Sequence, residues 1–226
     1  MSGRFITLDG SEGVGKSTQL ANIRAWCEAH GITARYGREP GGTPLGERLR
    51  DILLDRTTNA DPLTELLLLL AARRAHLQQT ILPALARGEW YISDRYRDAT
   101  YAYQHYGRGI PQATIAALEA ASDTARVPDL ALILESSPAT ARARLARRGA
   151  DQDRFEREPA DFFARVADGY RVRAQEPHSV LINAEDDAAT VFARIRPHLD
   201  ALRHRVLTLF PPAAARLWRP MADLWK

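Results

Sequence analysis

The sequence is short of the features that mark membrane-bound and disulfide-stabilised proteins. Its 226 residues include a single cysteine, Cys27, which excludes an internal disulfide framework and a cysteine-based zinc cluster. The longest apolar run, Leu66 to Ala72, is far shorter than the roughly 20 residues that a membrane-spanning helix requires. No basic-then-apolar leader precedes the first strand-like run, so we expect a cytoplasmic protein with no membrane partner.

The composition is that of a globular protein with a small excess of positive charge. Apolar residues make up 45% and charged residues 26%, which excludes disorder of the chain as a whole. Lys and Arg number 31 against 28 Asp and Glu, and the pI is about 9.2. Such a balance suits binding of nucleic acid or of small phosphorylated ligands, and the placement of the arginines decides between them.

Short apolar runs alternate with longer helical patterns along the chain. Strands are predicted over 4–9, 32–36, 90–94, 129–135 and 180–183, where β-branched residues cluster. Helices are predicted over 16–30, 63–82 and 140–149, with a loop rich in proline and glycine over 38–46. This alternation predicts an α/β fold with a five-stranded parallel sheet covered on both faces. Ligands gather at the carboxyl ends of such strands, where Asp9, Arg38 and Asp94 fall.

A phosphate-binding loop follows the first strand. The segment GSEGVGKST fits the pattern G-x-x-x-x-G-K-[ST], with a strand before it and a helix after it. Its glycines let successive backbone N–H groups point at phosphate oxygens. Lys16 is expected to reach the β and γ phosphates of ATP, and the Ser17 hydroxyl to ligate Mg²⁺. The residues predicted to bind ATP are Gly10, Ser11, Glu12, Gly13, Val14, Gly15, Lys16, Ser17 and Thr18.

The end of the third predicted strand leaves two interpretations open. Asp94 and Arg95 place a carboxylate and a guanidinium together at the ligand edge of the sheet. Asp94 could act on a Mg²⁺-bound water, and Arg95 could grip a second phosphate by a bidentate contact. The two could equally form a structural ion pair.

An arginine-rich stretch over 140–158 has the composition of a phosphotransferase lid. Arginines that close over a transferring phosphoryl group stabilise its charge and exclude water. Arg142 and Arg144 are expected on the solvated face of a helix, whereas Arg148 and Arg154 are the lid candidates. The six histidines are scattered, and we expect surface or packing roles for them.

From about residue 4 to 200 the chain resembles the bacterial thymidylate kinase family. The resemblance rests on ordered motifs: GSEGVGKST, REPGGT, AAR, DRYRDATYAYQ, GRGIP, RVPDL and DRFE. It implies a P-loop kinase domain over 1–205 with a mobile lid at about 147–158, and an extension of unknown role over 206–226. It also implies Mg²⁺-dependent phosphorylation of dTMP by ATP, a homodimer, and no nucleic-acid partner.

The resemblance assigns roles to single residues. Glu12 matches a carboxylate near the sugar 3′-hydroxyl, and Arg38 and Arg95 match residues that hold the acceptor phosphate. Arg73 matches the guanidinium that reads the thymine edge. Thr100 faces the base, Tyr103 crowds the 2′ position and Gln104 lies beside it. Because Gly13 follows the loop carboxylate, the catalytic arginine is expected from the lid, as Arg154, with Arg148 at ATP. The implied catalytic set is therefore Lys16, Arg154, Glu12 and Arg95, with Ser17 and Asp94 at the metal.

One departure from the family pattern bears on the substrate. Leu69 stands where the family usually carries a phenylalanine that stacks on thymine. A kinase with a shifted acceptor such as dUMP is therefore an alternative. A P-loop regulator without phosphotransfer is a third reading, and it predicts a contiguous basic face with no acceptor pocket.

Overall fold

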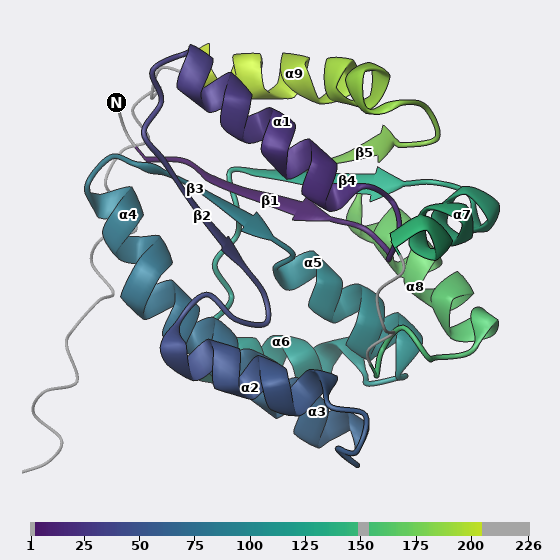
Figure 1. Cartoon of the computed structure of the whole chain (residues 1–226). Coiled ribbons are helices and arrows are strands. Elements are labelled where there is room, and N and C mark those ends of the chain that lie inside the picture. The colour runs from purple at the N-terminus through teal and green to yellow at the C-terminus, as the bar shows by residue number, and fades with distance from the viewer. Residues whose placement is uncertain (1–2, 149–153, 205–226) are drawn as a thin grey trace, which may run out of the picture.

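The computed structural model describes residues 3–148 and 154–204 and shows one parallel sheet between two layers of helices (Figure 1). The strand order is β2-β3-β1-β4-β5, and every neighbouring pair is parallel. The strands are β1 (Phe5–Asp9), β2 (Ala34–Arg38), β3 (Trp90–Asp94), β4 (Leu130–Glu135) and β5 (Ser179–Asn183). The predicted α/β class and the five-stranded parallel sheet are therefore confirmed.

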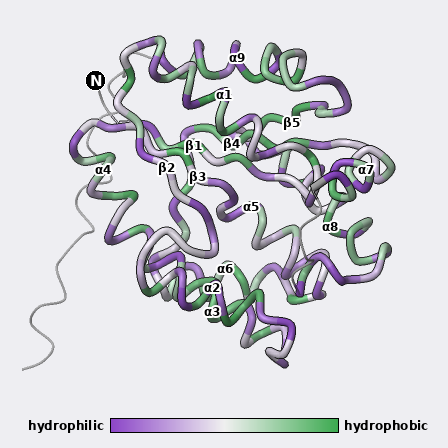
Figure 2. The backbone as a smooth tube through the Cα atoms, viewed as in Figure 1, coloured by the Kyte–Doolittle hydropathy of each residue, from purple (hydrophilic) through white to green (hydrophobic). Residues whose placement is uncertain are grey.

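Alternation of side chains along the central strands separates two cores. Ile6 and Leu8 of β1 pack with Ile23 of α1 and Ile195 of α9 on one face. Phe5 points to the opposite face, where it joins a separate cluster. Every residue of β1 is buried, including the polar Thr7 and Asp9. Figure 2 shows this hydrophobic centre as green strands between more polar outer helices.

Helices cover both faces of the sheet. On one face lie α1 (Lys16–Ala29) and α9 (Ala188–His204), as Figure 1 shows. The other segments are α2 (Pro44–Leu54), α3 (Pro62–His76), η1 (Leu77–Ile81), α4 (Leu82–Ala86), α5 (Arg97–Thr100), η2 (Tyr101–Gly107), α6 (Gln112–Ala121), α7 (Pro138–Arg148) and α8 (Ala160–Arg173). The segments η1 and η2 are π-helical.

The helix expected over 63–82 is divided in the structure. It runs as α3 to His76, continues as the π-helix η1, and resumes as α4. Pro83 explains the break, because its ring and missing N–H are incompatible with an ordinary helical turn before it. The loop expected over 38–46 is also shorter, since α2 begins at Pro44, where Thr43 accepts a hydrogen bond from the Gly46 N–H at 2.9 Å.

The carboxyl ends of β1, β2 and β3 carry Asp9, Arg38 and Asp94 as expected. Residues 149–153 of the expected lid and the extension over 206–226 lie outside the described residues. Within the described ranges, no helix combines the length and apolar character needed to span a membrane.

Candidate active site

The phosphate-binding loop connects β1 to α1 in a conformation that requires glycine at three positions. Gly10, Gly13 and Gly15 have φ values of 134°, 76° and 98°. A Cβ atom on Gly13 would lie 2.4 Å from the carbonyl oxygen of Ala141 in α7, so the loop packs too closely for any side chain there. The loop can therefore present its backbone to a ligand only with glycine at these positions.

Lys16 at the start of α1 folds back over the loop. Its Nζ donates to the carbonyl oxygens of Gly10 at 3.0 Å and Ser11 at 2.9 Å. Burial, reinforced by the neighbouring Arg95, lowers the pKa of Lys16 below its ordinary value. Among the described residues the ammonium has backbone carbonyl partners and no directly bonded carboxylate, which leaves it available to an anionic ligand.

A pocket opens over this loop, and we call it the donor-side pocket because the residues predicted to bind the phosphoryl donor ATP line it. Glu12 to Thr18 line it, together with Asp94, Arg144 and Arg147. The Oδ1 atom of Asp94 is buried without a hydrogen-bond partner in the described part of the chain. The side chain of Arg148, expected at ATP, is outside what the structure describes.

Arg144 differs from its expected place on a solvated helix face. Its guanidinium donates to the carbonyl oxygens of Ala184 at 2.8 Å, Asp186 at 3.0 Å and Val14 at 3.3 Å. The expectation was wrong because the face of α7 that carries Arg144 turns toward the loops after β1 and β5. Arg142, by contrast, is exposed as expected.

A second pocket lies beside the first, on the other side of Glu12. The predicted residues that line it are Glu12, Leu69, Arg73, Arg95, Thr100, Tyr103 and Gln104. Glu39, Pro40, Arg50 and Phe155 line it as well. Glu12 lines both pockets, so a ligand on the phosphate-binding loop and a ligand in the second pocket would meet at this carboxylate.

Arg95 stands at this junction on a strained backbone. Its φ of 64° lies in the left-handed region, which non-glycine residues rarely adopt. Its guanidinium pairs with Glu12 and donates to the Gly10 carbonyl and to the Tyr170 hydroxyl, each at 2.9 Å. Asp94 instead faces the donor-side pocket, which favours separate ligand roles over a structural pair between the two.

Asp9 is a second carboxyl group near Arg95, but Glu12 supplies more of the negative charge that faces the guanidinium. Asp9 ends β1 and is completely buried, and its Oδ1 accepts from the Tyr96 N–H at 3.3 Å. Burial and the nearby Asp98 raise the pKa of Asp9 to about 7, although Arg95 acts in the opposite direction. Near neutral pH this carboxyl is therefore partly protonated.

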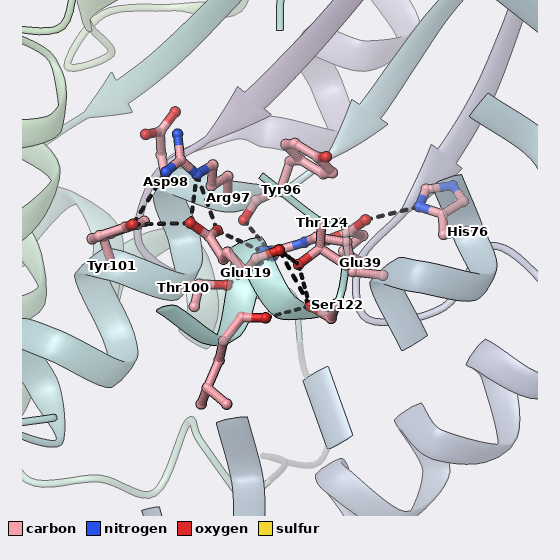
Figure 3. A network of polar contacts seen from close by, with 12 residues as sticks. Glu39, His76, Tyr96, Arg97, Asp98, Thr100, Tyr101, Glu119, Ser122 and Thr124 are labelled. Atoms are coloured by element: carbon pink, nitrogen blue, oxygen red, sulfur yellow. Dashed lines mark hydrogen bonds and ion pairs between the residues drawn. The ribbon is translucent and has the colours of Figure 1, made fainter. Parts of the chain in front are cut away.

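Arg73 lines the second pocket from α3 and has several partners, of which Glu39, Thr100 and Glu119 are labelled in Figure 3. Its Nε donates to Glu39 at 2.6 Å and its Nη2 donates to Thr100 Oγ1 at 2.7 Å. Its Nη1 lies 3.5 Å from a carboxylate oxygen of Glu119. Burial raises the pKa of Glu39, but Arg73 and His76 outweigh it and hold that pKa below its usual range. Glu39 is therefore an ionised partner for Arg73.

Two predicted arginines are not brought into these pockets. Arg38 is exposed and pairs with Glu47 at 2.7 Å, and it is not among the described residues that line the second pocket. Arg154 donates to the Leu53 carbonyl at 3.0 Å and to Glu65 at 2.5 Å, so its guanidinium is held away from the phosphate-binding loop.

Sequence reasoning missed several lining residues. Glu39 and Phe155 belong to the REPGGT and DRFE motifs, so the motifs located them without assigning them a task. Arg50 on α2 had no such signal, because it lies within an amphipathic pattern common to surface helices. Tyr170 of α8 joins the site through its hydroxyl contact with Arg95 and its edge contact with the Tyr103 ring.

The chain is similar to known proteins over almost its whole described length. Residues 8–195 match the family model described as thymidylate kinase. The chain is 51% identical over 202 residues to thymidylate kinase of Dichelobacter nodosus, covering 89% of this chain and 100% of that protein. It is 49% identical over 197 residues to thymidylate kinase of Thiobacillus denitrificans, with 86% and 95% covered. A crystal structure of thymidylate kinase from Ehrlichia chaffeensis matches with a TM-score of 0.70 at 29% identity, covering 88% of this chain and 100% of that chain. The similarity thus includes both pockets.

Proposed function

Because the chain belongs to the thymidylate kinase family and is therefore a nucleoside monophosphate kinase, we propose that it transfers the γ-phosphoryl group of ATP to dTMP. The product is dTDP, a precursor of dTTP. One observation supports this proposal most strongly: Glu12 lines both the donor-side pocket and the second pocket, so nucleotides bound in the two pockets would lie within reach of one another. In this proposal the second pocket is the acceptor pocket, the site of dTMP. Its presence counts against a P-loop regulator, because that interpretation predicted no acceptor pocket.

In this proposal the residues position and neutralise charge rather than react covalently. Lys16 exchanges its carbonyl partners for the β and γ phosphates of ATP, and Arg95 holds the phosphate of dTMP. Glu12 lies near the sugar 3′-hydroxyl and Tyr103 crowds the 2′ position. Because the acceptor oxygen of dTMP is already anionic, no strong general base is required.

The other end of the acceptor pocket is proposed to recognise the base. Arg73 donates to the thymine edge, while Thr100 and Gln104 flank it and Leu69 covers one ring face. Arg38, which points outward here, is proposed to turn toward the acceptor phosphate when dTMP binds, by leaving its exposed contact with Glu47. Exposed ion pairs of this kind contribute little to stability, so the exchange costs little.

We propose that Ser17 and Asp94 hold the Mg²⁺ that accompanies ATP. Both line the donor-side pocket, and the unpartnered Asp94 Oδ1 is a buried acceptor that a cation would satisfy. Mg²⁺ prefers one or two carboxylates, phosphate oxygens and retained waters, so this sparse donor set fits it. Bound there, Mg²⁺ would supply positive charge that neutralises the phosphates of ATP during transfer.

The substrate assignment is tested by ADP release with MgATP and each of dTMP, dUMP, dGMP and dCMP. We expect the largest kcat/KM with dTMP. A larger value with dUMP would favour the shifted acceptor that Leu69 suggests, and no ADP release with any acceptor would remove the kinase assignment.

Replacing Leu69 with phenylalanine should strengthen dTMP binding. Leu69 lines the acceptor pocket one helical turn before Arg73, where leucine covers the base without the stacking contribution of an aromatic ring. That contribution corresponds to a decrease in KM for dTMP of about threefold to tenfold. KM for ATP should not change. Leu181→Phe, at an exposed site on β5, is the control, and equal effects of the two variants would contradict the prediction.

We further propose that the chain forms a homodimer. Leu45 and Ile52 of α2 and Leu63 and Leu67 of α3 are large apolar side chains that are each about half exposed, from 46% to 51%. The two helices pack against each other on the side of the molecule away from α9 (Figure 2), so their apolar side chains form a face suited to association. Light scattering that returned the monomer mass of 25.2 kDa would contradict this proposal.

A further inference from the structure

His76, near the carboxyl end of α3, is a completely buried polar side chain to which the proposed reaction gives no task. Both of its ring nitrogens have partners: Nδ1 lies 3.0 Å from Glu39 Oε1, and Nε2 lies 2.7 Å from the Tyr91 hydroxyl. Figure 3 shows the contact between His76 and Glu39. Since Glu39 also accepts from Arg73, the histidine is connected to the base-reading guanidinium through one carboxylate.

The charge of Glu39 fixes the direction of its hydrogen bond with His76. Glu39 is ionised and can only accept, so His76 Nδ1 carries the proton and donates. Burial raises the pKa of Tyr91, which keeps its hydroxyl protonated. The Tyr91 hydroxyl therefore remains a neutral partner of Nε2, and the hydrogen-bond chain links Tyr91, His76 and Glu39, whose other oxygen accepts from Arg73.

Two glycines leave the space that the His76 ring occupies. A Cβ atom on Gly42 would lie 2.4 Å from His76 Cδ2, and a Cβ atom on Gly37 would lie 2.6 Å from Nε2. Gly42 also has a φ of 77°, so the REPGGT loop bends tightly at the ring. The loop that supplies Glu39 and Pro40 to the acceptor pocket is thus packed around His76 as well as bonded to it.

We propose that His76 is a positioning residue of the acceptor pocket. It holds the Glu39 carboxylate, and through that carboxylate it holds Arg73 and the loop over 38–43 in the arrangement that receives the acceptor nucleotide. This inference rests on the proposed function, because it takes the pocket around Arg73 to be the dTMP site.

The test compares acceptor and donor kinetics of the His76→Gln variant. Loss of one buried hydrogen bond to Glu39 should raise KM for dTMP about tenfold. KM for ATP and kcat should each stay within about threefold, and the preference for dTMP over dCMP should fall. Tyr91→Phe preserves the aromatic packing and removes only the far hydroxyl, so it should raise KM for dTMP in the same direction by about threefold.

A matched control and a double variant separate positioning from general destabilisation. His30→Gln alters another histidine, which contacts the Trp26 carbonyl oxygen at 2.7 Å on the opposite face of the sheet, and should leave both KM values unchanged. In a Glu39→Gln background, the addition of His76→Gln should raise KM for dTMP by less than about twofold, because the link to Arg73 is already broken.

The outcomes distinguish this inference from the function on which it rests. If Arg73→Ala leaves KM for dTMP unchanged, the acceptor pocket is misassigned. If Arg73→Ala raises KM but His76→Gln and Tyr91→Phe only lower the melting temperature, the pocket assignment stands and the positioning role is overturned. Equal rises in both KM values also overturn it. If His76→Gln fails to fold, Tyr91→Phe alone decides.

Discussion

We expect the Lys16→Met variant to lose about 10³-fold in kcat, while its KM for dTMP stays within about twofold of the wild-type value. Methionine matches the length of the lysine stem but carries no charge. Within the part of the chain that the structure describes, the ammonium donates to two backbone carbonyl oxygens and to no carboxylate, so its removal breaks no buried ion pair there. The loss should therefore appear when negative charge develops on the transferring phosphoryl group.

The control for this prediction lies on the same helix. Arg24 is an exposed cation of α1 stacked 3.8 Å from the Tyr36 ring centroid, so Arg24→Met removes one positive charge away from the pockets. It should retain kcat within about twofold. Lys16 and Lys226 are the two lysines of the sequence, so protection of Lys16 from amine acetylation by MgATP provides a second readout. Wild-type kcat in Lys16→Met would remove Lys16 from the reaction.

The Arg154→Ala variant should also lose about 10³-fold in kcat, with KM for dTMP nearly unchanged. In the proposed reaction Arg154 brings a cation to the γ phosphate, the lid role that the family resemblance implies where Gly13 follows the loop carboxylate. Arg154 is here held by Glu65 and by the Leu53 carbonyl, with its guanidinium 4.9 Å from the Phe155 ring centroid. It must leave these contacts to act on the phosphoryl group.

Two features make the Arg154 experiment decisive. Glu65 retains Arg108 at 3.2 Å after the substitution, so the buried carboxylate is not left without a cation and the variant should fold. Arg157 belongs to the same segment and is exposed, so Arg157→Ala controls for loss of charge near the lid. A rise in KM for dTMP with unchanged kcat would make Arg154 a binding residue instead of a catalytic one.

The sheet and the phosphate-binding loop were predictable because their signals are local. A buried strand shows as a continuous apolar run, and the loop shows as glycines, a lysine and a serine at fixed spacing. The residues proposed to bind the acceptor were predicted from ordered motifs. Arg73 belongs to a different motif from Arg95 and Thr100, and the three residues line one pocket in the structure.

The orientation of side chains in space was harder to predict. Whether Arg144 faces solvent or the loop after β5 depends on how α7 packs, and the sequence of one helix does not contain that information. The π-helical segments depend on a proline and on tertiary contacts. His76 is read from sequence as an ordinary packing residue, because its partners Glu39 and Tyr91 lie on other elements.

The sheet topology also controls when the site can exist during folding. Arg95 and the Gly10 carbonyl that it contacts are 85 positions apart in the chain, and Phe5 bonds Asp129 across 124 positions. These contacts close long loops. The entropic cost of closing each loop comes before the stabilisation that strand pairing then provides. The left-handed backbone of Arg95 and its contact with the phosphate-binding loop can persist only after β1 and β3 have paired. Native secondary structure should therefore return before activity in refolding, because binding competence belongs to the last, cooperative step.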